Sequence, residues 1–211
     1  PYPGGLVSVS WFQKDVDSPI EYTQRYAVNI GTYTTPVNYP EGELNGYEFE
    51  VRQRLGNFWP ALKGLSIGAN ATFIDSEVTV SEEDAQELEA QGFSEPTRDM
   101  LNTPEYLYNF NMQYDHAPTR TQVGLFYTVK GDTLIAGSGQ RTGNYIPSVY
   151  AKEYGELNFS ISQKLGEHWT LSFKAKNLLN PEIETAYRSK YIGDDVTKTS
   201  YTKGREFSVS I

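Results

Sequence analysis

The chain has 211 residues, enough for one large domain or two small ones. Its 27 acidic side chains outnumber 18 basic ones, which disfavours a nucleic-acid partner, and the absence of cysteine excludes disulfides and thiol chemistry. The two histidines, His116 and His168, are far apart in sequence, so neither a metal site nor a cofactor is expected. No apolar run is long enough for a membrane-spanning helix. Aromatic residues make up 14% of the chain, which is high for a soluble domain.

The first predicted element is a β-strand at 6–12, in which Val7, Val9 and Trp11 alternate with Ser8 and Ser10. A long polar stretch, 18–43, follows it. The second strand, "LNGYEFEVRQRL" (44–55), has a mostly apolar face and a fully charged one, because successive strand side chains point to opposite faces. The charged face consists of Glu48, Glu50, Arg52 and Arg54.

The same two-residue period recurs along the rest of the chain, at 65–73, 106–114, 121–129, 157–165, 169–177 and 206–211. The sequence thus predicts about eight strands, most of roughly 9–13 residues, and a membrane-spanning strand needs about 9–11.

The connections between the predicted strands alternate in length. Those at 56–64, 115–119 and 166–168 are short, whereas 18–43, 79–103, 131–149 and 181–203 are long and polar. Within them, "SEEDAQELEAQ" (81–91) predicts a short helix or a mobile loop. Short turns at one end and long loops at the other are typical of an outer-membrane barrel.

Aromatic residues group at two levels of the predicted strands. Trp59, Tyr114 and Trp169 lie beside short turns, and Tyr47, Phe73, Tyr106 and Tyr127 lie at the opposite strand ends. This grouping predicts aromatic girdles at both membrane interfaces, although packing in an ordinary core is the alternative for each single residue.

The charged face of 44–55 fixes which side of the predicted sheet meets lipid. An arginine facing lipid at the bilayer midplane costs roughly 2–4 kcal/mol, so these four charges are expected to line the lumen. Because Arg52 and Arg54 lie beside Glu48 and Glu50 on one face, the pattern predicts a structural charge ladder, and a catalytic carboxylate pair is the alternative.

Several segments, taken in chain order, resemble the C-terminal part of TonB-dependent outer-membrane receptors. They are "GGLVSVSWFQKDVDSPI", "LNGYEFEVRQRL", "LKGLSIGANATFIDSEV", "LNTPEYLYNFNMQYD", "WTLSFKAKNLLNPE" and "GREFSVSI". The resemblance covers nearly the whole chain. It implies an all-β, antiparallel transmembrane β-barrel of about 22 strands, of which 1–211 would supply about the last eight.

The resemblance also implies a function. Such receptors bind a scarce ligand (an iron chelate, cobalamin or a glycan) at extracellular loops and import it with energy delivered through TonB. The implied partners are outer-membrane lipid, the small-molecule ligand, the plug and remaining barrel strands, and the TonB complex. The plug and the TonB-contacting box have no counterpart here, "PYPGG" reads as a periplasmic turn, and the chain ends on Ile211 instead of an aromatic residue. We therefore expect the protein to continue beyond both ends.

The sequence contains no catalytic constellation or phosphate-binding loop, so no enzyme is predicted. Candidate ligand contacts lie in the long loops, since loops carry binding residues more often than strands do. These candidates are Arg141, Asn144 and Tyr145 in "GQRTGNYIP", and Tyr187 and Arg188 in "ETAYRSKY". The alternative for each is an ordinary solvated loop residue.

Two other readings remain open from the residues alone. A passive porin or a small structural barrel would share the strand pattern and the membrane location. A soluble carbohydrate-binding β-sandwich would also have alternating strands, with the apolar rows packed against each other.

Overall fold

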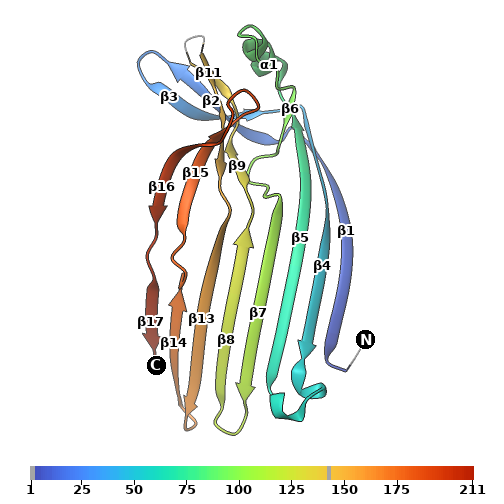
Figure 1. Ribbon diagram of the computed structural model, residues 1–211, viewed down its shortest axis with the longest axis vertical. Helices are drawn as coiled ribbons and strands as arrows, with labels where there is room; N and C mark the ends of the chain where they lie inside the picture. Colours follow the sequence, from blue (N-terminus) through green and yellow to red (C-terminus); the bar gives the residue numbers. More distant parts are fainter. Residues whose placement is uncertain (1–2, 142–143) are drawn as a thin grey trace.

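A computed structural model describes residues 3–141 and 144–211 of the chain. Its main feature is one curved antiparallel sheet with the strand order β1-β4-β5-β7-β8-β13-β14-β17, which we call the wall (Figure 1). The strands are β1 (Gly5–Asp17), β4 (Glu41–Arg54), β5 (Leu65–Thr79), β7 (Tyr106–His116), β8 (Thr121–Lys130), β13 (Tyr154–Leu165), β14 (Trp169–Lys176) and β17 (Glu206–Ser210). The predicted strands are thereby confirmed. Within the described residues β1 and β17 pair on one side only, so the barrel is partial.

Apart from two short 3-10 turns between β4 and β5, the remaining elements gather at one end of the wall (Figure 1). We call 18–40, 80–105 and 131–153 the cap. The cap contains β2 (Ile20–Ala27), β3 (Gly31–Asn38), α1 (Glu82–Glu89), β6 (Thr97–Arg98), β9 (Thr133–Ala136), β10 (Gly139–Arg141), β11 (Asn144–Ile146) and β12 (Ser148–Ala151). The outer arm, 181–203, contains β15 (Glu182–Arg188) and β16 (Val196–Thr202), which join β12 and β9 in a four-stranded sheet.

Three of the long stretches predicted as polar loops, 18–43, 131–149 and 181–203, are therefore largely folded into strands, whereas 79–103 holds α1 and only the short β6. At the first of them, the backbone N–H of Ser18 donates to Pro40 and that of Tyr39 donates to Pro19, so the β1–β4 ladder continues into the β2–β3 hairpin. Proline has no N–H to donate, so it interrupts each strand locally without ending the pairing. Among the described residues no helix is both long and apolar enough to cross a membrane.

Within 81–91, the alternative of a short helix is correct, and the helix is α1. Ser81 caps it, since its hydroxyl accepts a hydrogen bond from the backbone N–H of Asp84. At the opposite end of the wall, two short 3-10 turns, η1 (Leu55–Asn57) and η2 (Pro60–Leu62), connect β4 to β5.

The cross-strand register places side chains of similar polarity side by side, so that each row across the wall is either apolar or polar. One row is apolar and reads Val7–Val51–Ala69–Phe110–Tyr127–Leu157 across six strands. A polar row reads Arg54–Ser66–Gln113–Gly124–Ser160–Lys174. A slip of one residue would exchange the two faces, so the alternation itself specifies the pairing.

Most of the buried apolar side chains belong to the cap and the outer arm, and a cluster of them lies where the cap meets the wall. Tyr39, Val78, Val80 and Met100 form a cluster against which Val16, Val37, Leu44 and Ala85 pack. Val16, Leu44 and Val78 alternate in register with the polar row and lie on its side of the sheet. The cap therefore folds onto the polar side of the wall.

Candidate functional site: a polar hollow below a packed cap

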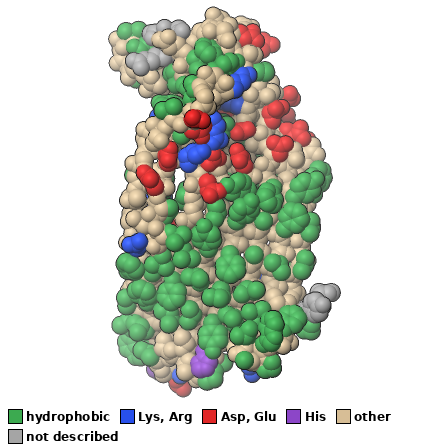
Figure 2. All heavy atoms as spheres, in the orientation of Figure 1, with side chains coloured by type: hydrophobic (Ala, Val, Ile, Leu, Met, Phe, Trp, Pro, Cys, Tyr) green, Lys and Arg blue, Asp and Glu red, His purple; other side chains and the backbone are tan. Residues whose placement is uncertain are grey.

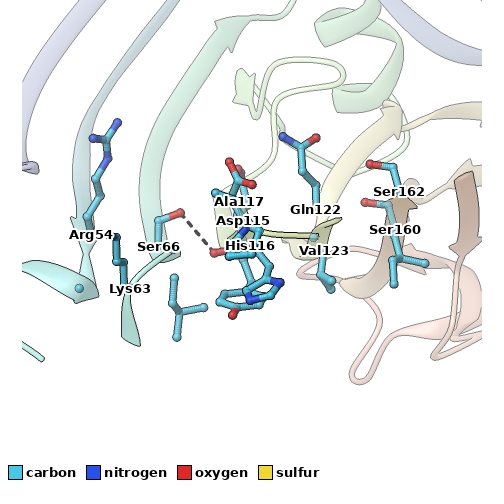
Figure 3. A pocket seen from close by; sticks show the side chains of 18 of the residues that line it. Arg54, Lys63, Ser66, Asp115, His116, Ala117, Gln122, Val123, Ser160 and Ser162 are labelled. Carbon is cyan, nitrogen blue, oxygen red and sulfur yellow. Dashed lines mark hydrogen bonds between the residues drawn. The ribbon is translucent and has the colours of Figure 1, made fainter. Parts of the chain in front are cut away.

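The concave face of the wall forms an open hollow of about 1550 Å³ near the short turns, lined by residues of β4, β5, β7, β8, β13 and β14 (Figure 3). All six residues of the polar row line it, and none of the six in the apolar row does. The inner side of the curved sheet is thus the polar side. Hydrophobic side chains cover the lower part of one face of the wall, and charged side chains gather above them (Figure 2).

The predicted charge ladder lies on the inner side. Arg52 Nε and Glu50 Oε1 form an ion pair, and the Arg52 side chain is 67% exposed. An exposed pair of this kind contributes only about 0–1 kcal/mol. Arg54 lies two residues after Arg52 on the same face of β4 and lines the hollow. Glu48 lies nearer the cap, opposite Thr72 of β5.

Six of the predicted girdle residues take outward positions on strands of the wall, and Trp59 lies between η1 and η2. Tyr47, Phe73 and Tyr106 form one cross-strand row, which Trp11 of β1 extends, and Tyr127 lies four residues away on the ladder beside Phe110. Tyr114 and Trp169 lie near the ends of β7 and β14 that the short turns join.

One expectation about these rings was wrong. Tyr47 and Phe73 occupy the middle of β4 and β5, because both strands continue about six residues past the aromatic row. Trp11 was not among the predicted girdle residues, although its place in an alternating strand was a usable signal.

The structure separates the candidate ligand contacts. Asn144 is exposed in the β10–β11 hairpin. The backbone of Arg141 pairs with Asn144, and the Arg141 side chain lies outside the described residues. Tyr187 is half-buried on β15, with Lys198 Nζ 5.1 Å from its ring centroid.

Tyr145 is held by internal contacts among three segments. Its hydroxyl donates to Glu95 Oε1 at 2.6 Å and lies 2.7 Å from Ser189 Oγ. Its ring stacks on Phe93 at 4.3 Å and meets Tyr191 edge-on at 5.7 Å. Burial and the hydrogen bond to Glu95 raise the pKa of the Tyr145 hydroxyl. Tyr145 thus joins the cap to the outer arm.

Arg188 is the centre of an ion network that ties the outer arm to the cap. Its guanidinium donates to Asp132, and to Asp195 at 2.9 Å, and it lies 4.5 Å from the ring centroid of Tyr150. Lys152 Nζ bridges the same two carboxylates at 2.8 and 3.0 Å. Hydrogen bonds from Arg188 lower the pKa of Asp195 to about 2, against the opposing effect of partial burial.

The cap is fastened by buried polar contacts that the sequence did not reveal. Glu21 is 1% exposed and accepts a hydrogen bond from the backbone N–H of Leu101. Burial raises the pKa of Glu21, although that hydrogen bond and Arg98, 3.9 Å away, partly offset it. The Tyr39 hydroxyl donates to Asp84 at 2.9 Å. These partners come from different segments, so no local pattern signals them.

The structure also bears on two alternatives, a metal site and a β-sandwich. Throughout 3–141 and 144–211, no group of three or more His, Cys, Asp or Glu side chains could hold a metal ion. The main sheet is a single layer, so the two packed sheets of a β-sandwich do not describe this chain.

Comparison with known proteins places this architecture in a family. Residues 2–178 match the family model described as "TonB dependent receptor-like, beta-barrel". The crystal structure of the ferric-catecholate import receptor Fiu from E. coli K12, in a closed form, has the same fold, with a TM-score of 0.53 and 16% sequence identity. The match covers 85% of this chain but only 22% of Fiu, so the chain spans about a fifth of that receptor. No curated protein sequence gave a match.

Proteins of this family are in general outer-membrane receptors and transporters, not enzymes. The matched residues extend from β1 through β14, which is most of the wall and the whole cap. The chain belongs to the TonB-dependent receptor family and forms part of its β-barrel.

Proposed function

We propose that residues 1–211 are part of the C-terminal barrel wall of an outer-membrane receptor that binds a scarce ligand and imports it with energy from the TonB complex. The observation that carries this proposal is the single-layer wall, polar towards the hollow and apolar outside. Outer-membrane lipid would contact the apolar side. Further strands of a barrel of about 22 would pair with β1 and β17, and a plug would lie on the polar side.

We propose an iron chelate as the ligand, with cobalamin and glycans as the alternatives. Fiu, whose fold this chain shares, is by its title a ferric-catecholate import receptor. Asn144 and Tyr187 retain exposed surface for such a ligand. Arg188 and Tyr145 are engaged in internal contacts, so we assign them to positioning the outer arm.

Uptake measurements on cells test this function. Deletion of the complete gene should abolish uptake of one radioiron-labelled chelate from a panel that includes catecholates, and a strain without TonB should show the same loss. Cobalamin and labelled oligosaccharides are measured in parallel. Uptake that persists without TonB would indicate a passive pore, and unchanged uptake of every compound would contradict the proposal.

A further inference from the structure

The β2–β3 hairpin has one occupied edge and one open edge. The cap pairs with the β2 edge, where the backbone N–H of Gly137 donates to Tyr22 at 2.7 Å and that of Gln24 donates to Gly137 at 3.3 Å. Every hydrogen bond and ion pair that joins the hairpin to another described segment comes from β2. Among the described residues, β3 pairs with β2 alone.

The open edge of β3 presents unpaired backbone groups. Residues opposite each other in an antiparallel pair either bond each other or both point their backbone groups away. The two β2 residues that bond to Gly137 lie opposite Pro36 and Thr34, so the backbone groups of these two residues point away from β2. By the two-residue period, Thr32 and Asn38 are oriented in the same way. The N–H groups of Thr32, Thr34 and Asn38 therefore face the open edge.

β3 has few of the features that usually protect a sheet edge. Lysine, proline, bulges and short length are the common protections of natural edge strands. Gly31–Asn38 has eight residues and no charged side chain, and the side chains of its edge-facing residues are all exposed. Pro36 takes an edge-facing position, where the pairing with β2 needs no N–H, and leaves the other three N–H groups available. Such an edge can accept an added strand.

The open edge lies on the side of the hairpin away from the described cap segments. The hairpin leaves the wall at β1 and β4 and reaches across the cap end, so that β2 and β3 appear above β15 and β16 (Figure 1). Its β2 edge meets 131–153, which connects β8 to β13. β3 is thus the strand farther from that part of the wall. The match to Fiu covers only 22% of that receptor, so most of a receptor of that size lies beyond 1–211.

We propose that an extended segment of an extracellular loop, from the same receptor but outside 1–211, pairs with β3 as a third strand. An edge of eight residues is too small for a stable interface between separate proteins, which buries about 1,200–2,000 Å². A segment of the same molecule needs fewer bonds, because its effective concentration is high. The inference rests on the proposed function, since it requires further barrel strands and their loops. It adds a contact that fixes the hairpin across the mouth of the barrel.

Hydrogen exchange on the complete receptor in bilayers, resolved to single amides, tests this pairing. The amides of Thr32 and Thr34 should exchange about 100-fold or more slowly than unpaired amides do, as should Tyr33, whose N–H faces β2. Thr34→Pro removes one edge-facing N–H without removing a bond to β2 and should speed exchange at Thr32. Thr34→Ala keeps the N–H and is the matched control. Unprotected amides at Thr32 and Thr34 in the unchanged receptor would overturn the inference.

A photoreactive benzoylphenylalanine in place of Thr34 identifies the occupant. Mass spectrometry should find it joined to a peptide of the same polypeptide outside 1–211, and the same group at Lys190, exposed on the outer arm, should not capture that peptide. In a mixture of isotope-labelled and unlabelled receptor, the two joined peptides should carry the same label. Capture of a second copy or of a different protein would contradict the proposal.

Uptake of the labelled chelates separates this inference from the proposed function. TonB-dependent uptake by a receptor whose β3 amides are unprotected would contradict the added strand alone. Absence of uptake by the unchanged receptor would contradict the proposed function, whatever the exchange of the β3 amides.

Discussion

Apolar and polar side chains alternate in both halves of β5, but the apolar ones point outward in the lower half and inward in the upper half. In the lower half the outward positions are apolar and include Ala69 and Phe73. In the upper half the outward positions are Asp75 and Glu77, and the apolar side chain is Val78, which points inward and is fully buried in the cap cluster. The apolar side therefore changes faces within one strand.

The neighbouring strands change faces at the same level. On β4, Glu43 and Glu41 replace Tyr47 and Phe49 on the outer side, and the outward positions of β1 change in the same way from Trp11 to Asp15 and Asp17. Carboxylates are excluded from hydrocarbon, so under the proposed function we expect the switch to mark where the wall leaves the membrane. Below it, we expect the apolar side chains to face lipid, and above it they need a protein core.

The two methionines give the largest expected contrast between wall and cap. Met100 is 8% exposed in the cap cluster, and Met112 is 38% exposed on the outer side of β7. Met100→Ala should cost about 2–5 kcal/mol of cap stability, because it leaves a cavity. Met112→Ala should cost much less, because lipid refills the space. Hydrogen exchange of cap amides such as Leu101 measures this difference, and equal effects of both changes would contradict it.

An arginine placed on either side of β5 tests the lower half. Ala69→Arg puts the charge into lipid and should cost roughly 2–4 kcal/mol, which reduces assembly in the outer membrane. Thr72→Arg, on the inner side opposite Glu48, is the matched control and should assemble normally. Assembled protein is quantified by its heat-modifiable mobility in gels. Normal assembly of Ala69→Arg would refute the assignment of faces.

A methyl group at Gly137 should loosen the cap without touching the wall. An added Cβ would lie 1.3 Å from Arg98 Nη1, so Gly137→Ala must displace the buried arginine that lies beside Glu21. Such overpacking costs about 1–3 kcal/mol. Gly193→Ala, where nothing lies within 4 Å, is the control. Limited proteolysis of the β2–β3 hairpin should speed up only in the first variant, and equal rates would count against this packing.

Acid should release the outer arm before it affects the wall, and this is the smallest expected effect. The pKa of Asp195 is about 2 in the folded protein against 3.8 ordinarily, so its contribution is present above pH 3.8 and fades as the pH falls through 2. Hydrogen exchange at 189–195 should rise over that window. Asp195→Asn should remove most of this pH dependence, and an unchanged profile in that variant would exclude Asp195 as the cause.

The wall could be predicted from sequence, and the cap could not, for a physical reason. The two faces of the wall can be read from side chains two residues apart, such as Val7, Val9 and Trp11. This works because each face meets one kind of environment along much of the strand. Cap strands bury polar residues such as Glu21 and Gln24, whose partners lie far away in the chain. Local alternation is uninformative there.

The candidate contacts illustrate the same limit. Tyr145 and Arg188 were identified by their chemistry, but their contacts depend on Glu95 and Asp132, which approach only when the cap folds, and on Asp195, which approaches when the outer arm folds.

Spin labels along β7 test the orientation of the wall most directly, and the absence of native cysteine gives a clean background. Single cysteines at 108–113 are labelled in the complete protein in bilayers, and collision with oxygen and with a water-soluble nickel chelate is measured. Labels at Tyr108, Phe110 and Met112 should be oxygen-accessible, and labels at Asn109, Asn111 and Gln113 should not. A reversed phase, or no two-residue period, would contradict the account.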